Sequence, residues 1–201
     1  MQVLPPSPQA IALALEILNK GGVIAHATET CYGLACDLTN PAAVEKLFAI
    51  KERPTDQPMS ALFSSVEEAK KYVEWNDEAE KLAEKYLPGP LTLILPLRSD
   101  TPEKIYPTQL SIIHYPLSIS LGIRVSSHPL AQSLASKYGK PISTTSANVH
   151  GKPNPYSVEE IHNQFRGSKV KPDLILDSGI LPSVPPSTII NLIGNSQEIV
   201  R

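Results

Sequence analysis

Short runs of β-favouring residues alternate with well-punctuated helices along this chain, and no other feature restricts its fold as much. Helices are predicted behind capping or proline residues. They run over 8–20 after Ser7, from Asn40-Pro41 to the segment Lys51-Glu52-Arg53-Pro54, and from Ser65, Asn76 or Asp77, Pro129 and Ser157. Strands are predicted over 23–26, 59–63, 91–95, 117–125, 142–146, 173–177 and 187–192. Such an alternation is typical of the α/β class.

We expect the strands to form a mixed sheet rather than a purely parallel one. Prolines precede or interrupt several of the runs, and neighbouring runs between residues 90 and 125 resemble a hairpin. No internal repeat, low-complexity tract or long linker divides the sequence. Residues 1–201 are therefore predicted to form a single domain.

Composition excludes several classes of protein. A chain of 201 residues can bury a core without staples, and two cysteines, Cys31 and Cys36, rule out a disulfide framework or a four-cysteine zinc site. The formal net charge of −2 argues against a protein that grips nucleic acid over its whole face. The first residues, MQVLPPSPQ, lack the pattern of a signal peptide, and apolar runs such as 91–97 are too short to span a membrane. We therefore expect a cytoplasmic protein with no membrane attachment.

Two groups of polar residues lie in the first third of the chain. Thr28-Glu29-Thr30 follows a predicted strand, and its simplest interpretation is a turn whose hydroxyls satisfy backbone groups; the alternative is a lip around a small polar ligand. Lys51 and Arg53 follow a predicted helix, where cations commonly complement the helix dipole. A lysine point charge beside an arginine fork would also suit a polyphosphate.

Two further groups lie in later strands. Residues 143–148 carry four hydroxyls and an amide at the end of an apolar run, where α/β proteins hold phosphate or ribose oxygens. Ser187-Thr188, which opens the last predicted strand, is unremarkable alone. The cysteines are interpreted as core residues, and the histidines lack metal-ligand spacing. Glycine-rich nucleotide loops, HExxH and GxSxG are absent, which excludes the usual nucleotide-binding loops, zinc proteases and hydrolases. Residue chemistry alone therefore indicates no more than an α/β protein with an anion-accepting cleft.

The order of these groups makes the sequence recognisable. Six blocks follow one another along the chain: GGVIAHATETCYGLACD, KERPTDQP, PGPLTLIL, GIRVSSHPL, PISTTSANVHGKP and PSTIIN. From about residue 8 to the end, the sequence resembles the YrdC-like family of threonylcarbamoyl-AMP synthases, in the short form without an extra C-terminal domain. The K-x-R and S-x-N signatures of that family are met by Lys51, Arg53, Ser146 and Asn148.

The resemblance implies both a fold and a reaction. The fold is an open, twisted α/β sheet, here expected to be mixed, with flanking helices and a concave, positively charged cavity. In the reaction, L-threonine, bicarbonate or CO2, and ATP with Mg2+ give L-threonylcarbamoyladenylate and pyrophosphate. The product would be used by tRNA-modification proteins that make threonylcarbamoyladenosine. Attack of a carboxylate on the α-phosphorus needs positioning and charge neutralisation more than a general base.

The resemblance also assigns roles to individual residues. The implied ATP-binding residues are Lys51, Arg53, Gln57, Ser120, Ser146, Asn148 and Arg201. Of these, Lys51 and Arg53 are the implied catalytic pair on the triphosphate. The implied threonine-binding residues are Thr30, Arg124 and Ser187, with Arg124 offering a fork to the carboxylate. No metal bound tightly by the protein itself is expected.

Two other functions stay open at this point. The same fold could bind RNA weakly without chemistry, although the net charge of −2 and the aromatic content of 5% argue against it. A divergent relative could also use the cavity for a different nucleotide. Pyrophosphate release that depends on both L-threonine and bicarbonate would separate the three functions.

Overall fold

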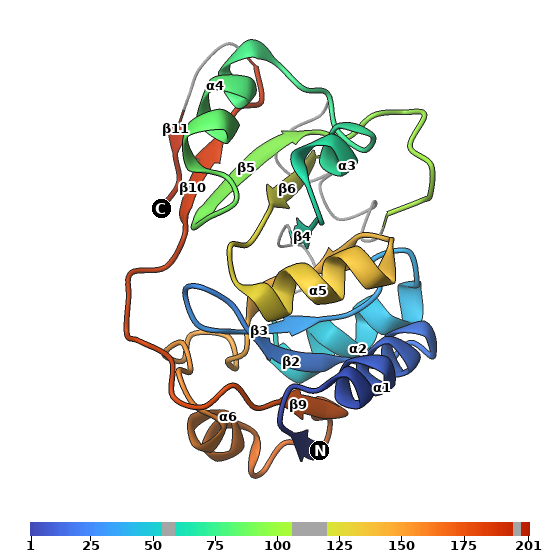
Figure 1. Cartoon of the computed structure of the whole chain (residues 1–201), viewed down its shortest axis with the longest axis vertical. Helices are drawn as coiled ribbons and strands as arrows, with labels where there is room; N and C mark the ends of the chain where they lie inside the picture. Colours follow the sequence, from blue (N-terminus) through green and yellow to red (C-terminus); the bar gives the residue numbers. More distant parts are fainter. Residues whose placement is uncertain (54–58, 106–119, 195–197) are drawn as a thin grey trace.

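The strands of the computed structural model, which describes residues 1–53, 59–105, 120–194 and 198–201, form two sheets (Figure 1). The order across the first sheet is β1 (Gln2–Leu4), β9 (Leu174–Leu176), β2 (Ile24–Ala27), β3 (Tyr32–Ala35) and β8 (Thr145–Ser146). The order across the second is β11 (Glu198–Ile199), β10 (Thr188–Asn191), β5 (Leu91–Pro96), β6 (Ser120–Arg124), β4 (Ser60–Leu62) and β7 (Ile142–Ser143). Both sheets are mixed, since β2 is parallel to β9 but antiparallel to β3, and β5 is parallel to β10 but antiparallel to β6.

The predicted mixed α/β class is confirmed, but the strands divide between two sheets rather than one. The division is clearest in the run 142–146, which the sequence predicts as one strand. It splits at Thr144 into β7, which pairs with β4 of the second sheet, and β8, which pairs with β3 of the first. The polar segment around Thr144 therefore links the two sheets.

Helices flank both sheets and begin where the capping residues predict. They are α1 (Pro8–Asn19), α2 (Pro41–Lys51), α3 (Val66–Lys70), α4 (Asp77–Tyr86), α5 (Pro129–Tyr138) and α6 (Val158–Phe165). A first-turn backbone N–H donates to the side chain of each of five predicted caps, Ser7, Asn40, Ser65, Asn76 and Ser157. Helix α5 ends at Gly139, whose left-handed backbone (φ +71°) favours glycine.

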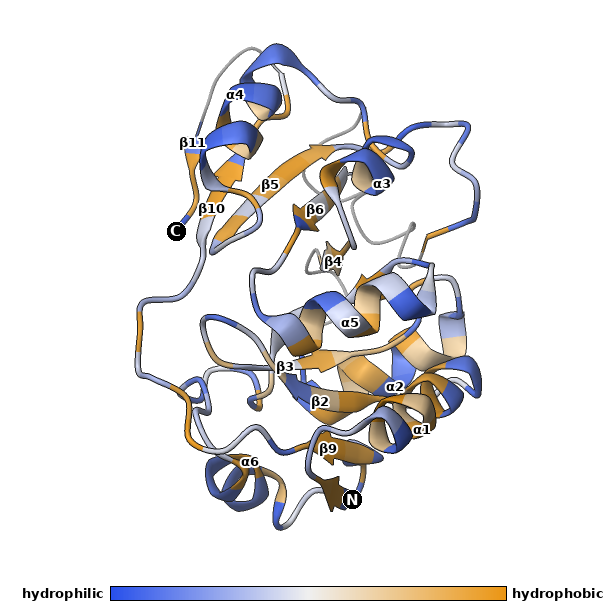
Figure 2. Ribbon diagram, in the orientation of Figure 1, coloured by the Kyte–Doolittle hydropathy of each residue, from blue (hydrophilic) through white to orange (hydrophobic). Residues whose placement is uncertain are grey.

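Alternation of apolar residues along the first sheet explains how helices cover both of its faces. Ile24 and Ala35 belong to the apolar cluster that includes α1 and α5, whereas Ala25 and Leu34 belong to the cluster that includes α2 and α6. The cluster that includes α2 and α6 also extends into the second sheet and under α3 and α4. Figure 2 shows the apolar strands between helices whose outer faces are hydrophilic.

Three strands are not predicted by the sequence: β1, β3 and β11. Strand β3 forms an antiparallel hairpin with β2, and the hydroxyl-rich residues 28–31 are its loop. Gly33 weakens the β signal of this segment, because glycine has low strand propensity. The first polar group therefore sits at a hairpin tip rather than at the end of an isolated strand.

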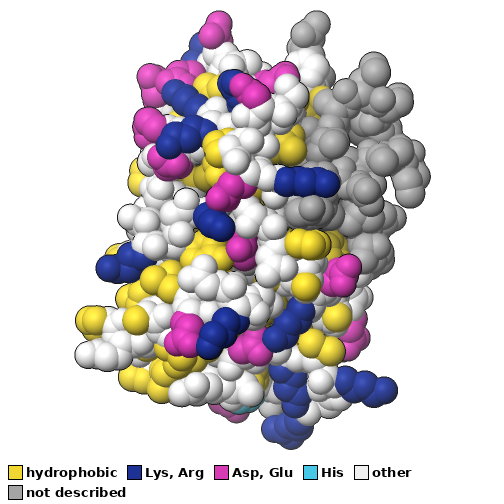
Figure 3. All heavy atoms as spheres, turned by 90° about the vertical axis from the view of Figure 1, so that its right-hand side faces the viewer, with side chains coloured by type: hydrophobic (Ala, Val, Ile, Leu, Met, Phe, Trp, Pro, Cys, Tyr) yellow, Lys and Arg dark blue, Asp and Glu magenta, His cyan; other side chains and the backbone are white. Residues whose placement is uncertain are grey.

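The surface carries charges of both signs. On the face shown in Figure 3, Lys and Arg side chains lie interspersed with Asp and Glu side chains. Within the part of the chain that the structure describes, every helix is too short or too polar to cross a membrane.

Candidate functional site

A polar cavity of about 170 Å3 is lined by residues from both sheets. Five segments meet there: the β2–β3 loop, the second residue after α2, the end of β6, the β7–β8 junction and the residues around the start of β10. The lining residues are Thr30, Cys31, Arg53, Ser60, Thr92, Arg124, Thr144, Thr145, Ser146, Asn154, Pro186, Ser187, Ile189 and Arg201. Six of the ten predicted site residues are among them.

Three arginines line the cavity. Arg53, Arg124 and Arg201 all line it, and no Asp, Glu or His is among its lining residues in the described ranges. Burial, together with the nearby Arg124 charge, lowers the pKa of Arg201 below its ordinary value. Three guanidinium groups with hydroxyls between them favour a ligand that carries carboxylate or phosphate.

The three predicted threonine-binding residues lie in this one cavity. Arg124, at the end of β6, is 8% exposed, and its Nη2 donates to Thr30 Oγ1 at 2.8 Å. Ser187 precedes β10, and its Oγ lies 3.3 Å from Thr92 Oγ1. The Arg201 side chain reaches the same serine, with Nε 3.3 Å from Ser187 O. The Arg124 guanidinium and the Thr30 and Ser187 hydroxyls therefore belong to residues that line one small cavity.

Lys51 and Arg53 are only two residues apart but occupy different environments. Lys51 ends α2 and is 4% exposed, and it does not line the cavity. Its Nζ donates to Ser146 O (2.6 Å), Asn148 O (3.0 Å) and Asn148 Oδ1 (3.0 Å). Arg53 lines the cavity and is only half-buried. Between them Glu52 adopts a left-handed backbone (φ 49°), which turns the chain at the end of the helix.

Burial opposes the charge on Lys51, whereas its hydrogen-bond acceptors support that charge. Burial lowers the pKa of the Lys51 ammonium to about 7, and the Arg53 charge acts in the same direction. Three oxygen acceptors, however, match the three N–H donors of an ammonium. The buried amine therefore links α2 to the segment around Ser146 through hydrogen bonds.

The S-x-N residues form one network with this lysine. Ser146 Oγ donates to Asn148 Oδ1 at 2.6 Å, and Asn148 Nδ2 donates to Lys152 O at 2.5 Å. Asn148 is 7% exposed and is not a lining residue of the cavity, whereas Ser146 is one. The K-x-R and S-x-N signatures therefore meet in space, with Arg53 and Ser146 facing the ligand side.

One predicted ATP-binding residue, Ser120, lies elsewhere in the structure. Ser120 begins β6, four residues before Arg124, which at about 3.3 Å per residue places it about 13 Å along the strand and outside the cavity lining. Gln57 lies outside the described residues.

Some lining residues were missed as individual site residues. They are Cys31, Ser60, Thr92, Thr144, Thr145, Asn154, Pro186 and Ile189. The signal for Thr92 was its hydroxyl inside the apolar run LTLIL, and that for the two threonines was the polar cluster at 143–148.

Cys31 is placed in the cavity wall rather than in the core. It is 7% exposed, and burial raises the pKa of its thiol despite the Arg124, Lys51 and Arg201 charges nearby. Cys36 is fully buried, and burial raises the pKa of its thiol to about 12. Neither environment favours a thiolate nucleophile.

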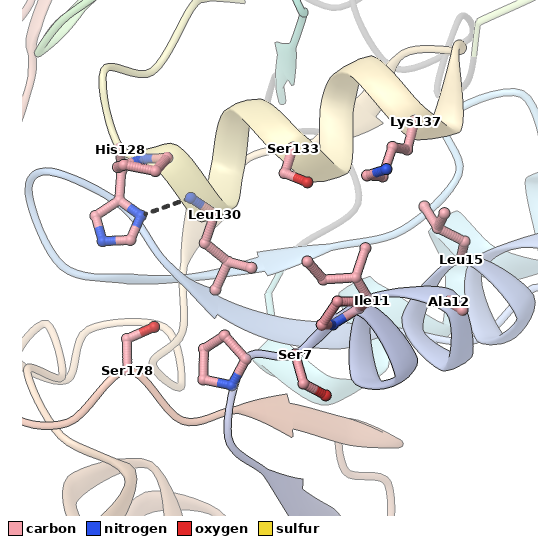
Figure 4. Close-up of a pocket in the computed structure, with 12 residues that line it drawn as sticks. Ser7, Ile11, Ala12, Leu15, His128, Leu130, Ser133, Lys137 and Ser178 are labelled. Carbon is pink, nitrogen blue, oxygen red and sulfur yellow. Dashed lines mark hydrogen bonds between the residues drawn. The ribbon is translucent and has the colours of Figure 1, made fainter.

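A second, larger cavity of about 660 Å3 lies between α1 and α5 (Figure 4). Ile11, Leu15 and Leu130 line it with prolines, and Lys137 lies near one end. It shares no lining residue with the arginine-rich cavity. The smaller cavity, which the arginines line, is therefore the better candidate for binding an anionic ligand.

Comparison with known proteins agrees with this geometry. A family model for Sua5, YciO and YrdC proteins, described as "Telomere recombination", matches residues 16–201. The chain belongs to the Sua5/YciO/YrdC family. It is 35% identical over 151 residues to a threonylcarbamoyl-AMP synthase of Photobacterium profundum, an alignment that covers 74% of this chain and 77% of that relative.

Solved structures of the Sua5/YciO/YrdC family share the fold. The chain matches P. abyssi Sua5 complexed with L-threonine with a TM-score of 0.84 and 31% identity, over 100% of this chain. It spans 56% of that longer chain. It matches E. coli YciO with a TM-score of 0.81 and 28% identity, over 100% of this chain and 92% of that one. The family resemblance of the sequence is thus confirmed.

Proposed function

We propose that this chain is an L-threonylcarbamoyladenylate synthase, which makes threonylcarbamoyl-AMP and pyrophosphate from L-threonine, bicarbonate or CO2, and ATP. The observation that carries the proposal is a cavity in which Arg124, Thr30 and Ser187 face the same volume as Arg53 and Ser146. Membership of the family supports it. So do relatives named threonylcarbamoyl-AMP synthase and the fold shared with a protein solved with L-threonine.

The size of the cavity suits an amino acid. Pockets for drug-sized ligands occupy about 300–1,000 Å3, whereas this cavity measures about 170 Å3. In our proposal, the threonine carboxylate lies against Arg124, and the β-hydroxyl bonds to Thr30 or Ser187. ATP is too large for this volume and extends from it, with its phosphates against Arg53 and Ser146.

The proposed chemistry proceeds in two bond-forming steps. The neutral amine of threonine attacks the carbon of CO2 and forms an N–C bond while one C=O π bond of CO2 opens. The nitrogen then gives up a proton to water, which yields N-carboxythreonine. An oxygen of the new carboxylate then attacks the α-phosphorus of ATP in line with the departing pyrophosphate. One P–O bond forms as another breaks, so the site must align two anions and neutralise charge rather than supply a strong base.

The residues of the site divide this work. Arg53 neutralises charge on the phosphates, where a fixed guanidinium costs no reorganisation during the reaction. Lys51 positions Ser146 and Asn148 through its three hydrogen bonds. No lining residue in the described ranges is a carboxylate, so this donor set does not fit a resident Mg2+ site. We infer that Mg2+ arrives bound to ATP, as part of the substrate.

The proposed product defines the partners. A mixed carbamic–phosphoric anhydride is an activated acyl donor, so proteins that transfer threonylcarbamoyl to tRNA would consume it, in the cytoplasm. The alternative of an RNA-binding module is not favoured, because the cations of the site are enclosed in a small cavity and charges of both signs mix on the face in Figure 3.

The test is pyrophosphate release by the purified protein with ATP and Mg2+, with each other substrate omitted in turn. We expect release only when L-threonine and bicarbonate are both present. Release that ignores either one would refute the proposed function. Arg98→Ala is a matched control for the loss of a cavity arginine such as Arg53, and it should keep the wild-type rate. Arg98 is an exposed arginine that pairs with Asp100 and lies outside the cavity lining.

A further inference from the structure

Glu29, at the tip of the β2–β3 loop, makes a buried ion pair with Arg124. Arg124 Nη2 donates to Glu29 Oε1 at 2.8 Å, and the two side chains are 10% and 15% exposed. The other carboxylate oxygen, Oε2, accepts a hydrogen bond from Ser126 Oγ. The carboxylate thus joins the loop both to the end of β6 and to the residues that follow that strand.

The loop is itself held in shape around this carboxylate. Thr28 Oγ1 donates to Cys31 O at 2.7 Å and accepts from the backbone N–H of Thr30 at 3.2 Å. Glu29 therefore projects from a fixed turn. Burial alone would raise the pKa of its carboxyl, but the Arg124 charge and the hydrogen bonds from Ser126 and Arg124 outweigh burial and keep that pKa below its ordinary value.

Arg124 depends on such a partner. Its Nη2 bridges Glu29 and Thr30, while its buried Nε has no hydrogen-bond partner among the described residues. Arg201 and Arg53 line the same cavity and repel it. Without a counter-charge, a mobile guanidinium in this cavity would move away from the other two cations.

We propose that Glu29 is a positioning residue for threonine recognition, which acts by fixing the Arg124 guanidinium against Thr30 and at the cavity wall. Glu29 is not itself a lining residue of the cavity, so in this proposal it does not contact the amino acid and acts on it through Arg124. The inference rests on the proposed function for its substrate. It assigns a role to Glu29 in the binding of one substrate, threonine, and none in the binding of ATP.

The test compares Glu29→Ala and Glu29→Gln with Asp37→Asn in steady-state pyrophosphate release. Asp37 is a matched control because it is 6% exposed, hydrogen-bonded by Thr39 and Tyr138, and absent from the cavity lining. We expect Glu29→Ala to raise the KM for threonine by about tenfold to a hundredfold, the effect of a misplaced binding group. The KM for ATP and kcat at saturating threonine should change by less than about threefold, a split that simple destabilisation would not produce.

Glu29→Gln keeps an acceptor for Arg124 and should recover part of the loss, and it also serves if the alanine variant does not fold. Adding Glu29→Gln to an Arg124→Gln protein should have almost no further effect on threonine binding, measured by calorimetry. Additive losses would overturn the proposal, as would an unchanged threonine KM or an equal change in Asp37→Asn. If the wild-type protein shows no threonine-dependent release at all, the proposed function fails instead.

Discussion

Arg53→Ala should separate catalysis from folding. The Arg53 side chain is half-buried at the cavity, and the backbone N–H of Arg53, which donates to Phe48 O at 3.2 Å, is unchanged by the substitution. A cost below about 1 kcal/mol is expected for loss of a partly exposed charge. For a chain of this length, 1 kcal/mol corresponds to a shift in Tm of about 2–4 °C.

The effect of this change on catalysis should be much larger. Removing one fixed charge that stabilises the transition state costs about a hundredfold or more in rate, or about 2.7 kcal/mol. The assay is pyrophosphate release at saturating threonine and bicarbonate, beside thermal unfolding followed by circular dichroism. A Tm lowered by more than about 10 °C, with activity lost in parallel, would show that Arg53 serves the fold and would refute this reasoning.

Replacing both cysteines (Cys31→Ser with Cys36→Ala) should keep most of the activity, because burial raises the pKa of both thiols; a folded but inactive variant would place a thiol in the chemistry. His26 is fully buried, and burial lowers its pKa from 6.5 to about 4, so the unfolded chain binds more protons between those values. Stability should therefore be complete above pH 6.5 and fall by about 3 kcal/mol as the pH drops to 4, and a His26→Gln variant should lack this loss in denaturant titrations. Serine should be a weak alternative substrate and 2-aminobutyrate a poorer one, since a missing hydroxyl leaves buried polar groups unpaired whereas a missing methyl costs only about 1–3 kcal/mol. Equal rates with 2-aminobutyrate and threonine would show that the hydroxyl contacts assigned to Thr30 and Ser187 are wrong.

Local signals in the sequence were sufficient for the helices and for most strands. Each cap is a side chain acting on its own first turn, as at Ser7 and Asn40, so its effect is visible without tertiary structure. The division into two sheets was not predictable in this way. It depends on Thr144, where the chain leaves one sheet for the other. The partner of β7 lies about 80 residues away in the sequence, and the partner of β8 lies about 110 residues away.

The membership of the site was predictable in part, and its geometry was not. Family signatures brought Arg53, Arg124 and Ser146 to one cavity, and the structure places them there. The burial of Lys51 was not visible, because a lysine at the end of a helix has the same sequence pattern whether it points to solvent or inward. Its direction is set by the Asn148 and Ser146 oxygens that it meets, and these contacts span 95 to 97 residues.

Incorporation of labelled bicarbonate tests the central claim most directly. The protein would be incubated with 13C-bicarbonate, L-threonine, ATP and Mg2+, and the nucleotide products identified at once by mass spectrometry. The account predicts one product that contains threonine, AMP and a single labelled carbon, formed in equal amount to pyrophosphate and lost in Arg53→Ala. An adenylate of threonine without the labelled carbon, or pyrophosphate released with no labelled adenylate, would contradict it.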